Sequence, residues 1–282
     1  MSTLQNKIDF IALVSVINAN PNGDPLNGNR PRSDYNGYGE ITAECIKRKI
    51  RNRMQDLGNN IFVQMESRSD DGCESLSERA ADLAKECEGD REAFVENACK
   101  KWLDVRSFGQ VFAYKDLKGT SIGVRGPVSI HQVVSVSPIE IESVQITKSV
   151  NGDRTKDGKK SPDTMGMKHI VRFGLYKIKG SINVQLAEKT GFTEKDADTL
   201  KECLRTLFEN DASAARPEGS MEVVKLYWFR HYNKAGQYSS AKVHRTLEIT
   251  QRDESAIPTS IDDYSIELNE LPGLDVEVIE DM

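Results

Sequence analysis

The chain has 282 residues, with 38 Lys and Arg against 44 Asp and Glu, so its formal net charge is −6. That length is ample for a hydrophobic core, and no apolar run of about 18 residues predicts a membrane span. The N-terminus MSTLQNKIDF lacks the basic-then-apolar pattern of a signal peptide. The five cysteines include no CxxC pair, which favours a reducing cytoplasm over a disulfide framework or zinc site. No cofactor is predicted.

The charge is unevenly distributed along the chain. Residues 253–282 carry ten carboxylates and no Lys or Arg, and residues 66–96 form a second acidic stretch. Basic residues gather at 30–53 and 148–179. Because local charge sets the field at a groove more than net charge does, the sequence remains compatible with a polyanionic partner.

The hydrophobic pattern predicts elements in the order strand, helix, strand, strand, helix, strand. This order is typical of an α+β, ferredoxin-like antiparallel sheet with helices on one face, as in RNA-recognition domains. The predicted strands are 8–19, 105–114, 126–139, 169–186 (a long strand or bent hairpin) and 221–233, and the helices are 42–58 and 192–210. We expect one domain, 1–282, with a helical insertion at 60–102, a polar insertion at 140–168 and an acidic C-terminal segment at 253–282.

The stretch NPNGDPLNGNRPRSDYNGYGE, residues 20–40, follows the first predicted strand. Its Gly spacing resembles a P-loop, but Asn29 and Arg30 stand where Lys and a hydroxyl are required. It also resembles an EF-hand, but Pro25 replaces the turn glycine and the twelfth-position Glu is missing. The Asn-Gly pairs alone indicate turns. About twenty residues without structure are unusual unless they bind something, which favours a polymer ligand near Arg30 and Arg32.

The helix after this loop is predicted to begin at the N-cap Thr42 and to end at Gly58. Its apolar positions recur every three or four residues, and five basic residues lie beside them: Lys47, Arg48, Lys49, Arg51 and Arg53. Glu44 can partly neutralise Arg48 at i+4, so Lys47 and Arg51 are expected to be the freer pair. This density of basic residues favours a phosphate track over a face that only confers solubility.

Three segments together carry a family resemblance: NPNGDPLNGNRPR, then ITAECIKRKIRN, then TMGMKHIVRFGLY at 164–176. They resemble the backbone subunit of type I CRISPR interference (Cascade) complexes, the Cas-seven family, and within it the type I-C branch. The resemblance implies an RNA-recognition-like palm with a helical finger and a β-hairpin thumb. It also implies a non-catalytic subunit whose copies polymerise along a guide RNA, with target DNA and other Cascade subunits as further partners.

The resemblance also implies which residues contact RNA. The thumb would fall in KSVNGDRTKDGKKSPDTMGMKH, residues 148–169, where Met165 or Met167 suits a wedge against an unstacked base, or simply packs within a hairpin. Arg125 could reach the RNA backbone from its Gly-flanked strand entry, or could have no part in binding. The candidate contacts are Asn20, Asn22, Arg30, Arg32, Lys47, Arg48, Arg51, Arg125, Met165, Met167 and Lys168.

Two features leave alternatives open. Related type III subunits cleave RNA with an early-loop Asp, so Asp24 could serve a metal-dependent ribonuclease, although Asp-Pro also starts a turn. The four histidines have no metal-ligand spacing. The acidic C-terminal segment could repel stray nucleic acid or dock on a neighbour, but its alternating pattern favours ordered strands. Finally, the aromatic cluster Tyr227, Trp228, Phe229 and Tyr232 is expected to be core packing rather than a base cage.

Overall fold

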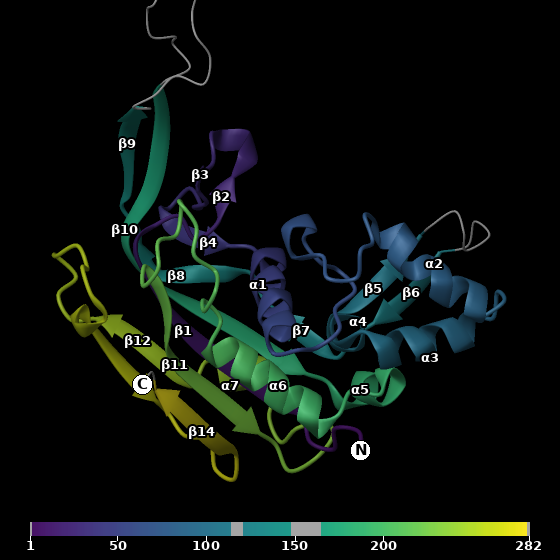
Figure 1. The fold of residues 1–282 in the computed structure, drawn as a ribbon. Coiled ribbons are helices and arrows are strands. Elements are labelled where there is room, and N and C mark those ends of the chain that lie inside the picture. Colours follow the sequence, from purple (N-terminus) through teal and green to yellow (C-terminus); the bar gives the residue numbers. More distant parts are fainter. Residues whose placement is uncertain (1, 114–120, 148–164, 281–282) are drawn as a thin grey trace, which may run out of the picture.

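A single large antiparallel sheet organises the protein (Figure 1). The computed structural model describes residues 2–113, 121–147 and 165–280. The sheet has the strand order β14-β11-β1-β10-β8-β4, and β7 and β9 also pair with β10. These strands are β1 (Ile8–Ala19), β4 (Tyr38–Ile41), β7 (Val128–Ile130), β8 (Val133–Pro138), β9 (Ile141–Thr147), β10 (Met165–Ile182), β11 (Met221–Arg230) and β14 (Asp275–Glu280).

The first strand, β1, is buried on both faces. Its nine residues from Ile8 to Val16 all lie in the interior, which explains why its sequence runs apolar without the alternation of a half-exposed strand. It pairs with β10 on one side and with β11 on the other. The expected strand at 8–19 is therefore confirmed, at the centre of the sheet.

One face of the sheet is covered by α1 (Ala43–Asp56) and α6 (Glu194–Arg205), which pack against each other (Figure 1). Both begin where the sequence predicts. The Thr42 Oγ1 accepts a hydrogen bond from the Cys45 amide at 3.1 Å, and Thr193 forms a capping box with Asp196. Helix α6 ends at Arg205, five residues before the predicted end, while α5 (Val184–Thr190) precedes it.

The opposite face is covered by α7 (Ser240–His244) and the hairpin of β12 (Leu247–Gln251) and β13 (Tyr264–Leu268). Strand β12 has no counterpart among the predicted strands, whereas the strands expected in the acidic segment are present as β13 and β14. Tyr227, Trp228 and Phe229 are buried as expected, but Tyr232 is 60% exposed.

Buried residues between Phe62 and Ile122 form a second hydrophobic cluster apart from the main core. It holds the expected helices, α2 (Leu76–Glu86) and α3 (Arg91–Lys101), with η2 (Glu66–Arg68) before them. The strand expected at 105–114 is only partly correct. Its first residues form α4 (Leu103–Phe108), and the strand proper, β5 (Gly109–Phe112), pairs with β6 (Ile122–Arg125). The turn from α4 into β5 uses Gly109 at φ 77°, a conformation that glycine tolerates.

Two further strand predictions are resolved by sheet pairing. The segment 126–139 is broken into β7 and β8, and the segment 169–186 contains the end of one unbroken strand, β10, rather than a bent hairpin. Strand β10 is long because it pairs with β1 over one part and with β9 over another. Its predicted end at 186 is wrong, since Asn183 caps helix α5.

The strands β9 and β10 extend together beyond the rest of the sheet as a projecting arm (Figure 1). The arm falls in the predicted insertion at 140–168, but residues 148–164, with the basic run expected there, lie outside the described residues. In the described part of the chain, no helix is long and apolar enough to cross a membrane.

Candidate nucleic-acid interface

The opening loop, expected to lack structure, is folded by its own side chains. It contains β2 (Gly23–Asp24), η1 (Pro25–Asn27) and β3 (Arg30–Pro31). The Asn20 amide donates to the Asn29 carbonyl at 2.7 Å, and the Asn22 Oδ1 accepts from the Thr42 amide at 2.9 Å. Buried Asn20 thus ties the loop to itself, and Asn22 ties it to the N-cap of α1.

Asp24 acts in the turn that Asp-Pro predicts. Its carboxylate caps η1 by accepting a hydrogen bond from the Leu26 amide at 3.2 Å, and it lies 3.4 Å from the Arg32 guanidinium. Within residues 2–113, 121–147 and 165–280, no group of three or more His, Cys, Asp and Glu side chains is arranged to hold a metal ion. The chemistry that the geometry assigns to Asp24 is therefore capping and charge pairing.

Arg30 joins the opening loop to the projecting arm. Its Nη1 lies 3.0 Å from the Ser143 Oγ on β9 and 3.3 Å from the His169 Nδ1 on β10. Ser143 and His169 are themselves 2.9 Å apart. These two partners come from more than 110 residues along the chain, so sequence periodicity gave no signal for them. A half-exposed guanidinium with such partners retains N–H donors for an anionic ligand.

The register of the arm decides which side chains share a face with Arg30. Directly paired residues of an antiparallel ladder lie on the same face. We call "the methionine face" the set that includes both of Arg30's partners: Ser143, Gln145, Thr147, Met165, Met167 and His169. Met165 and Met167 are 58% and 55% exposed. Lys168 lies on the other face, opposite Val144, so the predicted arm residues do not act together.

Most of the basic residues of α1 are paired inside the protein, although the sequence predicts that they form a phosphate track. Arg51 is not free: its Nε lies 2.9 Å from the Oδ2 of Asp104, which is fully buried. Arg48 donates to the Val63 carbonyl at 2.7 Å, Lys49 is buried beside Asp211, and Arg53 bonds to Thr206 and Glu209. These four cations hold α1 to neighbouring segments. The run of five basic residues therefore mostly serves pairing inside the protein rather than a phosphate track.

Lys47 and Arg125 are accessible as well. Lys47 is half-exposed, with its ammonium 5.9 Å from the centre of the Phe108 ring. Arg125 is exposed on β6 at the edge of the second cluster. Neither contacts Arg30 or the methionine face through a described hydrogen bond. The structure therefore places the two partners of Arg30 on the same face of the arm as the two methionines, and it leaves Lys47 and Arg125 as separate positions.

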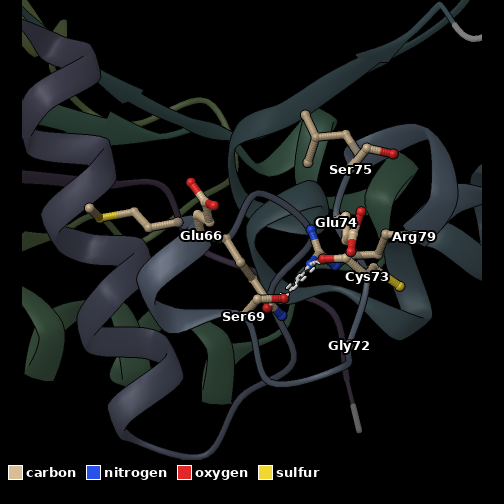
Figure 2. Close-up of a pocket in the computed structure, with 10 residues that line it drawn as sticks. Glu66, Ser69, Gly72, Cys73, Glu74, Ser75 and Arg79 are labelled. Atoms are coloured by element: carbon tan, nitrogen blue, oxygen red, sulfur yellow. Dashed lines mark hydrogen bonds between the residues drawn. The ribbon is translucent and has the colours of Figure 1, made fainter.

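A pocket of about 670 Å³ lies beside η2, in the insertion, and differs in chemistry from the arm (Figure 2). Arg79 crosses its floor and bonds to Asp71, Ser69 and the Phe62 carbonyl. This pairing lowers the pKa of the Asp71 carboxyl well below its usual value. Glu66 and Glu74 line the same pocket, so it does not suit an anionic ligand.

The fold and the candidate site define an α+β protein with one large antiparallel sheet, a projecting two-stranded arm and an arginine at the base of that arm. Comparison with known proteins identifies the family of the chain. The family model for CRISPR-associated protein Cas7 matches residues 6–269. The chain therefore belongs to the Cas7 family.

Individual relatives support this placement. The chain is 26% identical over 291 residues to a CRISPR-associated protein Cas7 of Haloferax volcanii, covering 96% of this chain and 83% of that protein. A solved chain of a "CRISPR RNA-guided surveillance complex, pre-nicking" aligns with a TM-score of 0.50 at 16% identity, over 84% of this chain and 81% of that chain. This structural likeness bears on the fold alone.

Proposed function

We propose that this protein is a backbone subunit of a CRISPR RNA-guided surveillance complex of type I, in which its copies polymerise along a guide RNA. Family membership supports the class of function, and the solved chain of similar fold comes from a complex of that description. In this role the protein grips phosphates and leaves the bases free to pair with target DNA. We place it in the cytoplasm, with guide RNA, further copies of itself and other Cascade subunits as partners.

The finer fold assignments belong to the same proposal. The strands β11-β1-β10-β7 have the neighbour order of a ferredoxin-like sheet, counted fourth, first, third and second among the core strands. We assign residues 60–102 to a finger, because they carry most of a separate hydrophobic cluster, and residues 140–168 to a thumb that includes the arm. The type I-C branch rests on the resemblance of the three sequence segments.

The observation that carries the RNA-binding proposal is the junction of Arg30 with the methionine face. Arg30 contacts the arm through Ser143 and His169, on the face that also carries two exposed methionines. A cation and flexible apolar side chains on one face are the chemistry that would hold a phosphate next to a displaced base. Lys47, Arg125 and Lys168 are the secondary candidates. We assign Arg51, Arg48, Asn20 and Asn22 to shaping this surface, because each is held by an internal partner.

Substitution at Arg30 tests this proposal. Arg30→Ala should weaken guide RNA binding with little sequence preference and reduce the slope of log K against log salt by about one, because one phosphate contact is lost. Arg172→Ala is the matched control, since Arg172 is exposed on the other face of the arm beside Glu142. Equal losses in both variants, measured on RNA-free protein by fluorescence anisotropy, would contradict the role given to Arg30.

Two simpler measurements test the class of function. The purified native protein should show a 260 to 280 nm absorbance ratio typical of a ribonucleoprotein. We also propose that the subunit is non-catalytic: incubating the assembled complex with labelled complementary RNA and magnesium should give no periodic cleavage. Cuts that Asp24→Ala abolishes would instead establish a ribonuclease.

A further inference from the structure

A groove of about 350 Å³ opens on the face of the sheet opposite α1 and α6. Its lining residues come from β8, β10 and β12, with Gln132 just before β8. Its lining combines aliphatic residues with two lysines of β10. The lining residues are Gln132, Val134, Ser135, Val136, Lys177, Lys179, Leu247 and Ile249, which include no carboxylate.

Lys177 and Lys179 share a face because they are two residues apart on one strand. The Lys177 ammonium donates to the Leu247 carbonyl at 2.6 Å. In the part of the chain that the structure describes, neither lysine forms an ion pair with a carboxylate, and no hydrogen bond from the Lys179 ammonium is found. Two cations thus face one groove with donors to spare.

Two lysines that face one groove repel each other when no anion is bound between them. Burial, together with the neighbouring charge of Lys179, lowers the pKa of the Lys177 ammonium. Burial also lowers the pKa of nearby His244, the bond to Gly180 and the charge of Asp9 oppose this, and the charges of His131 and Lys179 add smaller downward contributions. An anion bound in the groove would relieve this like-charge repulsion.

The groove is separate from the candidate interface on the arm. Lys177 is eight residues along β10 from His169, which corresponds to about 26 Å of extended strand. The two sites also differ in surroundings, because β12 borders the groove whereas the opening loop borders the arm base. No nucleotide held at Arg30 can reach Lys179.

We propose that this groove is a second nucleic-acid contact, in which Lys177 and Lys179 hold a phosphate of a strand other than the one held at Arg30. The inference rests on the proposed function, since a guide that pairs with target DNA brings more than one strand to the protein. The aliphatic side chains of Val134, Val136 and Ile249 in the lining suit the sugar faces that flank a phosphate. Gln132 supplies a neutral donor at the rim.

The test uses the protein as purified, with any co-purified RNA in place, and a fluorescent 12-nucleotide oligo(dT) at low salt. Lys179→Ala should raise the Kd about five- to tenfold and reduce the salt slope by about one, because one phosphate contact is lost. Lys179→Arg should restore binding. The matched control is Lys195→Ala, which removes the same charge from α6, on the far side of the sheet. Lys179 is preferred to Lys177, whose bond to Leu247 holds β12 in place.

The outcomes separate this inference from the proposed function. The 260 to 280 nm absorbance ratio should be the same in Lys179→Ala and the unmodified protein. A low ratio in both would count against guide RNA binding. The oligo(dT) affinities of the variants would still test the groove in that case. Equal Kd changes in Lys179→Ala and Lys195→Ala would overturn the groove as a site. Displacement by polyglutamate but not by unlabelled oligo(dT) would also overturn it, in favour of an acidic protein partner.

Discussion

At the scale of single residues, the partner of a charged side chain within the fold decides whether that side chain is available to a ligand. Asp104 is fully buried and accepts hydrogen bonds from the Phe62 and Val63 amides at 2.7 and 3.1 Å as well as from Arg51. One carboxylate therefore fixes α1, α4 and the start of the insertion together. Arg51, which the sequence offers as an RNA contact, is needed to neutralise it.

We predict that Asp104→Ala destabilises the protein by about 3–5 kcal/mol, because it leaves Arg51 and two backbone amides without their shared acceptor. The measurement is urea unfolding followed by circular dichroism. The control is Asp82→Ala, which breaks an exposed pair with Lys85 and should cost less than about 1 kcal/mol. A small effect at Asp104 would mean that solvent reaches the site.

At the scale of elements, the neighbours of β10 decide which residue a position on this strand can hold. A Cβ atom on Gly180 would lie 2.1 Å from the Phe10 Cζ and 2.6 Å from the Ser129 carbonyl oxygen. The glycine is thus required by close packing between β10, β1 and β7. Gly123 on β6 has no neighbour within 4 Å of such an atom.

Gly180→Ala is predicted to lower the free energy of unfolding by about 1–3 kcal/mol through overpacking. Gly123→Ala, which adds the same methyl group to another strand, should be neutral or slightly stabilising. Thermal unfolding of the two variants beside the unmodified protein gives the comparison. Similar melting temperatures for both variants would show that Phe10 can move aside without cost.

The η2 loop should depend on pH through Asp71. Because Arg79 lowers the pKa of the Asp71 carboxyl in the folded state, ionised Asp71 stabilises the loop above the unfolded pKa of about 4. That stabilisation is lost as pH falls below about 4 towards the lower folded pKa. Hydrogen exchange of residues 62–75 between about pH 5 and pH 3 should show increasing opening, and Asp71→Asn should remove that dependence. An unchanged pH profile in Asp71→Asn would exclude this pair as its origin.

At the scale of the whole molecule, the sheet is covered on both faces, and the C-terminal segment provides one cover. Tyr264 on β13 is buried, with its ring 6.4 Å from that of Phe173 and its hydroxyl 2.5 Å from the Ser137 Oγ. The acidic residues of the last strand also pair with the body, since Glu277 contacts Lys201 and Glu280 contacts Lys225. The segment is therefore part of the fold.

Tyr264→Ala should destabilise the whole protein by about 3–5 kcal/mol, because a large buried ring is lost. Tyr264→Phe should cost about 1 kcal/mol, since only the hydroxyl contact is removed. A single cooperative urea transition is expected in both variants. Separate unfolding of the hairpin in Tyr264→Ala, seen as a second transition, would contradict a cover that is integral to the core.

Local patterns in the sequence determined much of this protein. The buried run of β1, the caps at Thr42 and Thr193 and the alternation in β13 and β14 are local features, and each was predictable because neighbouring residues decide it. The three family-like segments also pointed to the Cas7 family before any contact was known.

Only the tertiary structure decided which charges are free. Arg30 meets Ser143 and His169, Arg51 meets Asp104, and Lys179 faces a groove without a carboxylate, all through contacts distant in sequence. Periodicity places a residue on a face of its own helix or strand, but it does not show what packs against that face. Whether a cation is an internal partner or an available ligand depends on that second surface, which only the packing of distant segments supplies.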